Sequence, residues 1–460
     1  MSVKTLLFLG LFAACAAGAL FSPLLGVLGY MAHYCVGPER QWWGMEVSHW
    51  GLRYSFALGA ATALGTLLHY RKLRFGASLL TSQELLALAF LAVVWLTLVF
   101  GEDTTWQQKA FSDQDAIHVK MAKVVFFTLM LTHVVTVRKN VDRVVWLLVI
   151  TSLMLGVQAY DTPHEWYNKG RLETVGGPDF RESNILAAHL AAVLPLIGMQ
   201  FLRTDWRGKI LCLVAGVFAT NAIILTRSRG AVVGLAVGSA VALLAAPGKH
   251  RAKIFAGLAV VLAGGLYLTD PGFIERAKTI DATEEERDTS AQSRIEIWQG
   301  GIEMALANPL GVGPGNFRSA IGRYAPQHPD RDAHNTFVRC VGELGFTGLL
   351  VYVVVIVNAF RMLVRIARRA RSLPQPDQDK FLYLSYGLAI SLTIFMGCSM
   401  TVTLLYTEGL WWFLLMPVCL GRALDNALPE ACLNHGGIPL GKRAEDKATV
   451  RRIGRSTVAD

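Results

Sequence analysis

Five arginines could bind a phosphate group. Arg227 and Arg229 stand in the tight turn LTRSRGAVVG, while Arg171, Arg181 and Arg294 lie in two longer polar segments. A guanidinium is always charged, and its planar fork of donors matches phosphate oxygens. We therefore interpret the turn as an anion clamp. The alternative is that the two side chains only extend to the membrane surface. Each of the other three, taken alone, is more simply a solvated charge.

His334 is the residue best suited to proton transfer. It precedes Asn335, Thr336 and a long apolar run, so we expect it at the N-terminus of a helix that Asp332 or Asn335 caps. The positive end of the helix dipole disfavours imidazolium, and a neutral ring can accept a proton near pH 7. The spacing therefore predicts a general base, the alternative being a histidine that only caps or anchors the helix.

Metal and nucleotide sites have little support. The Asp-Gln-Asp sequence at 113–115 is a pattern that can hold a divalent metal, but the same three residues recur at 377–379, which shows how readily the pattern arises. The seven cysteines form no CxxC pair and no zinc spacing. No GxxxxGK[ST] phosphate loop occurs. We expect no metal and no cofactor.

The elements that must position these residues are strongly apolar. Of the 460 residues, 53% are hydrophobic and 17% charged, and the mean hydropathy is +0.40. These values exclude an ordinary water-soluble enzyme. Apolar runs of about 17 residues or more recur along the chain, and each is roughly what a helix needs to cross ~30 Å of hydrocarbon. The predicted fold class is an all-α polytopic membrane protein with about 12 transmembrane helices and a large outer loop.

The predicted spans fall into two blocks around that loop. Residues 1–269 hold nine spans and an outer loop at 161–183, residues 270–336 form the large outer loop, and residues 337–420 hold three more spans before a solvated tail at 421–460. The first span is expected to tilt or to break near Pro23. The spans are 4–36, 51–69, 84–100, 119–137, 142–160, 184–202, 209–226, 230–246, 253–269, 337–363, 381–400 and 404–420.

The distribution of basic residues predicts the orientation. Most of the Lys and Arg of the short connections lie in one alternating set, namely 69–83, 138–143, 203–209, 247–253 and 361–380. The positive-inside rule places this set, and with it both termini, in the cytoplasm. The loops 161–183 and 270–336 then face the other side. Orientation in a membrane also explains the net charge of +10 better than nucleic-acid binding does.

The large outer loop contains one helix candidate and one turn. A helix from Thr289 to about Leu306, capped by Thr289 or Ser290, would lie along the membrane surface. The sequence NPLGVGPGNF at 308–317 must then turn, since it is rich in Gly and Pro. The apolar face of the helix is predicted to comprise Ala291, Ile295, Trp298, Ile302 and Ala305.

Residues 294–317 and 332–350 together resemble the shared domain of the O-antigen ligase and Wzy-type polymerase superfamily. In that domain an Arg-x-x-x-Trp helix and a Gly-rich turn precede a His-Asn pair at the start of a span. LTRSRGAVVG resembles the family's Ser-Arg-Gly turn, and residues 170–196 resemble its outer Arg loop with the span that follows. The similarity covers roughly residues 160–350, and the late outer loop matches the ligase architecture.

The resemblance implies a GT-C-like glycosyltransferase of the bacterial inner membrane. Such an enzyme transfers a glycan from undecaprenyl diphosphate, at the periplasmic face, to the lipid A core in ligases or to another lipid-linked repeat in polymerases. Membrane lipids are the other expected partners, and nucleic acid is not one. His334 would be the catalytic base. The implied diphosphate ligands are Arg229, Arg294 and Arg227, together with either Arg171 or Arg181, which compete for one family position. Three further residues could contact the sugar or shape the loop, namely Trp298, Asn335 and Gly313.

The chemistry of the reaction is compatible with those residues. A diphosphate departs as a stable anion, so arginines can stabilise it without a metal or a general acid. A positioned base typically contributes about 10²- to 10⁴-fold, and direct displacement would invert the anomeric centre. A polymerase or a protein O-glycan ligase differs from a lipid A core ligase only in the acceptor. A transporter is the distant alternative, but major-facilitator carriers place their long connection between spans six and seven, where this chain has only RTDWRGK.

Overall fold

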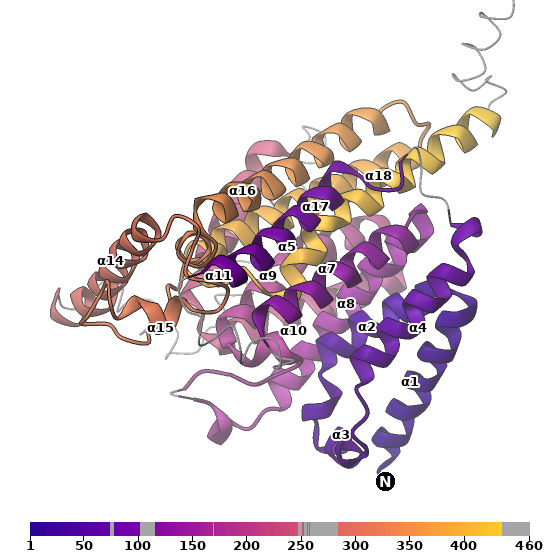
Figure 1. Ribbon diagram of the computed structural model, residues 1–460. Coiled ribbons are helices and arrows are strands. Elements are labelled where there is room, and N and C mark those ends of the chain that lie inside the picture. The colour runs from indigo at the N-terminus through magenta and orange to yellow at the C-terminus, as the bar shows by residue number, and fades with distance from the viewer. Residues whose placement is uncertain are drawn as a thin grey trace, which may run out of the picture.

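The structure, a computed structural model, is a bundle of α-helices (Figure 1). It describes residues 1–73, 78–101, 116–168, 170–246, 251–252, 255, 257 and 284–434. Over these ranges the all-α prediction is confirmed, since the only strand-like pairing is an isolated bridge between Asn168 and Arg171. Eight of the described helices are long and apolar enough to cross a membrane. The protein is therefore a helical membrane protein, while the count of twelve spans stays a prediction.

Each predicted span coincides with at least one helix, except 253–269, of which the structure describes only residues 255 and 257. The helices are α1 (Val3–Phe21), α2 (Pro23–Val36), α3 (Trp42–Met45), α4 (Tyr54–Leu68), α5 (Ser82–Phe100), α7 (Ile117–Val134), α8 (Arg138–Asp161), α9 (Ser183–Arg203), α10 (Trp206–Thr226), α11 (Arg229–Ala245), α14 (Glu284–Ala307), α15 (Phe317–Ile321), α16 (Thr336–Ala370), α17 (Asp377–Ser399) and α18 (Glu408–Asn434). Short 3₁₀ turns connect several of them.

The first predicted span is two antiparallel helices rather than one. The chain leaves helical geometry at Ser22, which is extended at φ −143°, and α2 restarts with Pro23 at its first position. Proline suits that position because its missing N–H would have no helical partner there. The two helices then lie side by side, with the ring of Phe8 stacked 6.3 Å from that of His33. The break near Pro23 is confirmed, and the single span from 4 to 36 is wrong.

This hairpin changes the position of the amino terminus. The backbone N–H of Ser2 donates to Glu46 at 2.7 Å, and the Thr5 hydroxyl donates to the carbonyl of Trp43 at 2.7 Å. The amino terminus therefore lies at the end of the bundle that carries the connection 37–50, and α18 ends at the opposite end (Figure 1). The amino terminus and the end of α18 thus lie at opposite ends of the bundle, because a chain that turns back at Ser22 passes along the bundle twice. Since residues 435–460 lie outside the described residues, the side on which both termini lie stays a prediction.

The basic connections lie together at the end of the bundle where α18 ends. Arg203 at the end of α9 lies 2.9 Å from Asp142 at the start of α8. Arg138 lies 3.9 Å from Asp377 at the start of α17. These ion pairs join connections that are far apart in the sequence, as the alternation of basic and non-basic connections predicts.

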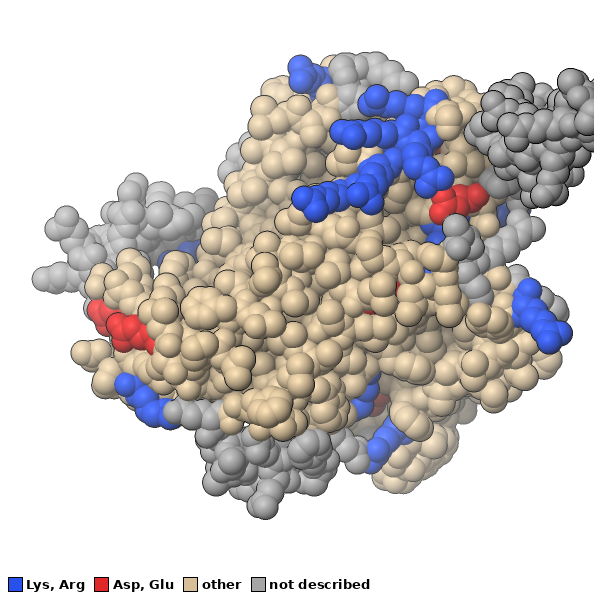
Figure 2. Space-filling view, turned by 45° about the horizontal axis from the view of Figure 1, so that its top comes forward, with Lys and Arg blue, Asp and Glu red and all other residues tan. Residues whose placement is uncertain are grey.

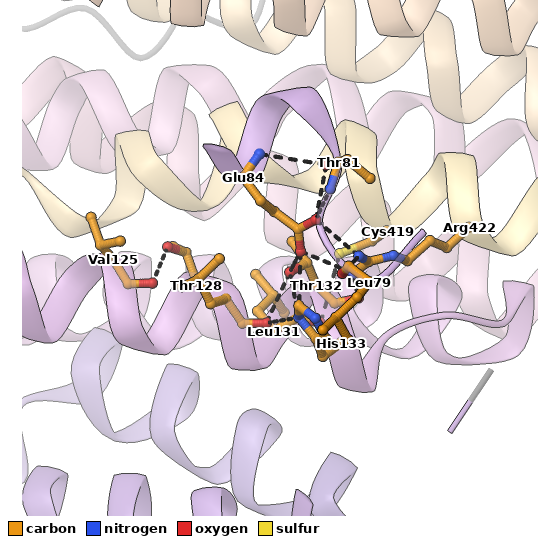
Figure 3. Close-up of polar contacts among 11 residues, drawn as sticks. Leu79, Thr81, Glu84, Val125, Thr128, Leu131, Thr132, His133, Cys419 and Arg422 are labelled. Atoms are coloured by element: carbon orange, nitrogen blue, oxygen red, sulfur yellow. Dashed lines mark hydrogen bonds and ion pairs between the residues drawn. The ribbon is translucent and has the colours of Figure 1, made fainter. Parts of the chain in front are cut away.

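A buried ion pair also holds this end of the bundle together (Figure 3). Glu84 is fully buried, and Arg422 of α18 is 2% exposed. Arg422 donates to both carboxylate oxygens of Glu84, at 3.0 and 2.9 Å, and to the carbonyls of Thr132 and Leu79 at 2.8 and 2.7 Å. The expected solvated tail at 421–460 is thus wrong in its first part, because α18 continues to Asn434 and buries Arg422. Residues 435–460 lie outside the described residues.

The buried pair leads to a prediction for stability. Arg422→Met should lower the free energy of unfolding by about 3–5 kcal/mol, because it leaves the Glu84 carboxylate buried without its counter-charge. The double variant Glu84→Gln/Arg422→Met should regain most of that loss. The measurement is unfolding by denaturant in detergent. Arg369→Met is the control, since the side chains of Arg369 and its partner Asp425 are 53% and 36% exposed. A single variant as stable as the wild type would show that the pair is not needed.

Candidate functional site

Helix α14 packs on α16 through one face and leaves two residues of the predicted apolar face exposed. It begins at Glu284, so the prediction that Thr289 or Ser290 caps it is wrong. Ile295 and Ile302 are 45% and 50% exposed, while Ile297, Met304 and Ala305 are buried. The contact with α16 is close because of a glycine: a Cβ added to Gly301 would lie 2.6 Å from a methyl carbon of Val338. That the helix lies along a membrane surface with Ile295 and Ile302 toward it stays a prediction.

His334 occupies an unusual backbone conformation beside the start of α16. Its φ is +46°, in the left-handed region that non-glycine residues rarely adopt. The next residue, Asn335, caps α16 by accepting from the N–H groups of Phe337 and Val338 at 2.9 and 3.2 Å. Asn335 is therefore buried and committed to the cap, while 40% of the His334 side chain remains exposed. The ring can be reached from outside.

Asp332 is the charged partner of His334, a role that the sequence interpretation missed. Its Oδ2 lies 3.9 Å from Nδ1 of His334 and accepts from the His334 backbone N–H at 3.4 Å. Arg339 and the Thr403 hydroxyl donate to the same carboxylate at 3.1 and 2.6 Å. Burial alone would raise the pKa of Asp332, but the Arg339 charge and the Thr403 hydrogen bond outweigh it and hold the pKa below its usual value. A carboxylate therefore stands beside the imidazole.

Trp298 connects α14 to the residue before His334. Its indole N–H donates to the carbonyl of Ala333 at 2.8 Å. Arg294 lies one helical turn before Trp298 on the same helix, so the hydrogen bond also brings Arg294 toward His334. Burial lowers the pKa of Arg294, and the nearby positive charge of Arg229 lowers it further. The two guanidinium groups of Arg294 and Arg229 are thus close enough to repel each other.

Arg229 reaches this place because the start of α11 packs on the turn at 401–403. Arg229 is the first residue of α11 and is exposed. A Cβ added to the next residue, Gly230, would lie 2.7 Å from the Thr401 hydroxyl. The same turn holds Asp332 through Thr403. The structure therefore places Arg229 near Arg294 and connects the segments of both to the loop that carries Asp332 and His334.

Arg171 supports the turn that carries Arg229. Its Nε donates to the carbonyl of Thr226 at 3.1 Å, and its Nη2 donates to Asn184 at 2.9 Å. Asn184 also accepts from the hydroxyl of Ser228, the residue before Arg229, at 2.9 Å. Arg171 thus ties the outer loop and α9 to the turn at 226–229.

Arg181 and Arg227 have other surroundings. Arg181 is exposed. The pKa of Arg40 is lowered first by the burial of Arg40 and then by the positive charge of Arg181. Arg227 ends α10 with a left-handed φ of +49°, and one of its terminal nitrogens would lie 2.9 Å from a Cβ on Gly170. Of the two arginines in the outer loop, Arg171 is the one bonded to the turn.

The Gly-rich turn is docked onto α16. Gly311, Gly313 and Gly315 all have φ between +88° and +100°, which requires glycine. The Gly313 N–H donates to the carbonyl of Glu343 at 3.0 Å. Opposite it, α16 breaks at Gly345, where a Cβ would lie 2.1 Å from the Pro309 carbonyl oxygen. The Gly313 amide is thus occupied by a backbone bond.

Residues 214–353 match the family described as O-Antigen ligase. This range contains Arg229, Arg294 and His334, and over it the predicted resemblance is confirmed. The Exopolysaccharide production protein ExoQ of Rhizobium meliloti (strain 1021) is 30% identical over 172 residues, which are 32% of this chain and 35% of that protein. The similarity thus spans about a third of the relative's length.

No cluster of three or more metal-binding side chains occurs in the part of the chain that the structure describes. The Asp-Gln-Asp sequence at 113–115 lies outside that part.

The docking of the turn gives a second prediction. Gly345→Ala should destabilise the protein by about 1–2 kcal/mol or more, because alanine disfavours a positive φ and its Cβ would clash with Pro309. Gly59→Ala is the matched control, since a Cβ there meets no atom within 4 Å. Thermal unfolding in detergent compares the two. Equal midpoints for both variants would show that the close contact at Gly345 is not needed.

Proposed function

We propose that this protein is a glycosyltransferase that moves a glycan from undecaprenyl diphosphate to an acceptor hydroxyl at the periplasmic face of the inner membrane. The observation that carries the proposal is that Arg229 and Arg294, which lie near each other, stand on segments that contact the loop in which Asp332 lies beside His334. The O-antigen ligase family match over residues 214–353 supports it. Neither the donor nor the reaction requires a cofactor in this scheme.

The two arginines bind the diphosphate of the donor. Their guanidinium groups repel each other, and Arg294 is partly buried. An anion between them removes the repulsion and accepts hydrogen bonds from both. As the glycosidic bond breaks, its electron pair passes to the diphosphate, and the same two groups stabilise the added charge. Arg171 holds the turn that carries Arg229.

His334 accepts the proton of the acceptor hydroxyl. The acceptor oxygen forms a bond to the anomeric carbon on the face opposite the diphosphate, so the configuration inverts. The hydroxyl proton passes to the exposed ring of His334, which becomes positively charged. Asp332, 3.9 Å from Nδ1, stabilises that charge electrostatically. Arg339 and Thr403 keep the Asp332 carboxylate ionised and in place.

The proposed orientation follows from the basic connections. The end of the bundle with the ion pairs of Arg138 and Arg203 faces the cytoplasm, together with the end of α18. The end with α14, α15 and the loop 161–183 faces the periplasm. The amino terminus, bonded to Glu46, then lies on the periplasmic side.

The acceptor that we propose is the sugar core of lipid A, as in O-antigen ligases. A polymerase that transfers to another lipid-linked repeat is the second candidate, and the name of the relative, an exopolysaccharide production protein, favours it. Purified protein, a lipid-linked glycan and either rough lipopolysaccharide or a second lipid-linked repeat distinguish the two. Transfer to lipopolysaccharide supports the ligase, and lengthening of the lipid-linked glycan supports the polymerase.

In that assay His334→Ala and Arg229→Ala should each reduce transfer at least about 10²-fold, because they remove the base and half of the diphosphate site. Both variants should insert into the membrane at wild-type levels. Arg53→Ala is the control, since Arg53 is an exposed arginine that precedes α4. Wild-type transfer by His334→Ala would remove the base assignment, and loss of transfer in Arg53→Ala would point to a general effect of charge.

Asp332→Asn tests the positioning role of the carboxylate. We expect kcat to fall by about 10- to 100-fold with KM for the donor nearly unchanged, because Asp332 acts on the charge that His334 gains during reaction. Glu296→Gln is the matched control, since Glu296 pairs with His328 at 2.7 Å and not with His334. A change confined to KM would instead assign Asp332 to substrate binding.

A further inference from the structure

The last turns of α16 carry an exposed group of arginines. Figure 2 shows Lys and Arg side chains gathered at the top of the molecule, the region in which Figure 1 places the end of α16. Arg369 pairs with Asp425 at 2.7 Å. No carboxylate within the described ranges lies at ion-pair distance from the other members of the group. The exposed arginines of this segment are Arg361, Arg365, Arg368, Arg369 and Arg371.

Three of these arginines lie on the same face of α16 as a row of exposed apolar side chains, which we call the lipid-facing stripe. Arg361, Arg365 and Arg368 follow one another at steps of four and three residues, which keeps them on one helical face. Earlier on the same face the helix exposes apolar side chains, and between the arginines it exposes Val364. The opposite face is buried in the bundle. The exposed apolar residues of the stripe are Phe346, Leu350, Val353, Val354 and Val357.

The position of the stripe along α16 matches the boundary of the membrane. After its break at Gly345, α16 runs 15 residues from Phe346 to Arg361, which is roughly 22 Å of the ~30 Å that a helix needs to cross hydrocarbon. Arg365 and Arg368 then lie roughly 6 and 10 Å beyond Arg361 along the axis. That distance corresponds to the headgroup layer on the side opposite the candidate site.

We propose that Arg361, Arg365 and Arg368 form a binding site for the phosphate headgroups of anionic phospholipids. Each guanidinium offers a planar fork to phosphate oxygens, and Val364 lies between them to contact the lipid below its headgroup. A soluble protein or nucleic acid fits this face less well, because the arginines share it with side chains that face the acyl chains. The proposal does not depend on the transferase activity.

Native mass spectrometry of the full-length, delipidated protein in detergent tests the site. The protein is titrated with phosphatidylglycerol and, separately, with phosphatidylcholine. Each basic residue near an anionic headgroup contributes roughly fivefold in affinity. Arg361→Gln/Arg365→Gln/Arg368→Gln should therefore weaken the tightest phosphatidylglycerol binding by more than about tenfold. Binding of phosphatidylcholine should be weak and unchanged.

The control variant is Arg71→Gln/Arg143→Gln/Arg207→Gln, which removes the same charge from three exposed arginines in other basic connections. It should bind phosphatidylglycerol as the wild type does. Equal weakening in both triple variants would overturn the site in favour of general charge. So would unchanged binding by the α16 variant, or displacement of the lipid by an equal concentration of inorganic phosphate. Arg→Lys replacement at the three positions should restore part of the affinity, which would exclude misfolding as the cause of the loss.

Discussion

The candidate site depends on Arg339, a charged side chain in the first turn of α16 that is 16% exposed. Its guanidinium lies between Asp332, at 3.1 Å, and Glu343, at 2.8 Å. Glu343 in turn accepts from the Tyr406 hydroxyl at 2.7 Å and from the Phe317 N–H at 3.2 Å. One cation therefore joins the loop of His334, the start of α15 and the segment before α18. Removing it would leave two carboxylates in a poorly hydrated place, which is costly.

At the opposite end of the bundle another arginine neutralises a buried carboxylate. There Arg422 lies between Glu84 and two backbone carbonyls, and Thr132 adds a hydrogen bond to Glu84 at 2.6 Å. In both places an arginine distributes its donors over several acceptors, so that neither the charge nor the acceptors stay unpaired. The apolar middle of the helices needs no such contacts. The ionic contacts fix the ends, and the ends carry the loops.

The sequence predicts the helices better than their contacts. Hydropathy locates the apolar helices because crossing the hydrocarbon needs a minimum apolar length. It cannot show that the chain reverses at Ser22, because a hairpin of two apolar helices and one long span have the same composition. It also does not show which face of α14 packs on α16, because Gly301, which permits the close contact with Val338, leaves no apolar signal.

For the site, too, the sequence predicts individual residues better than the contacts between them. His334, Arg229 and Arg294 stand out because charged or titratable groups are rare beside apolar runs. Asp332 is visible in the sequence only as a helix cap, and Asn335 takes that role instead. Its place beside His334 depends on Thr403 and Arg339, which lie on separate segments. The sequence also leaves Arg171 and Arg181 equivalent, and only the bond from Arg171 to the turn at 226–229 separates them.

Helix α16 relates the site to the membrane, because it carries the loop of His334 at one end and the row of arginines at the other. After its break at Gly345 the helix runs 15 residues to Arg361, roughly 22 Å of the ~30 Å of hydrocarbon. His334 stands before that break, on a loop that Asn335 and Trp298 hold to the helix end. We therefore expect the imidazole at the boundary opposite the arginines. The diphosphate of a lipid-linked donor would occupy that same level, since its polyprenyl tail stays in the hydrocarbon and its charge stays out of it.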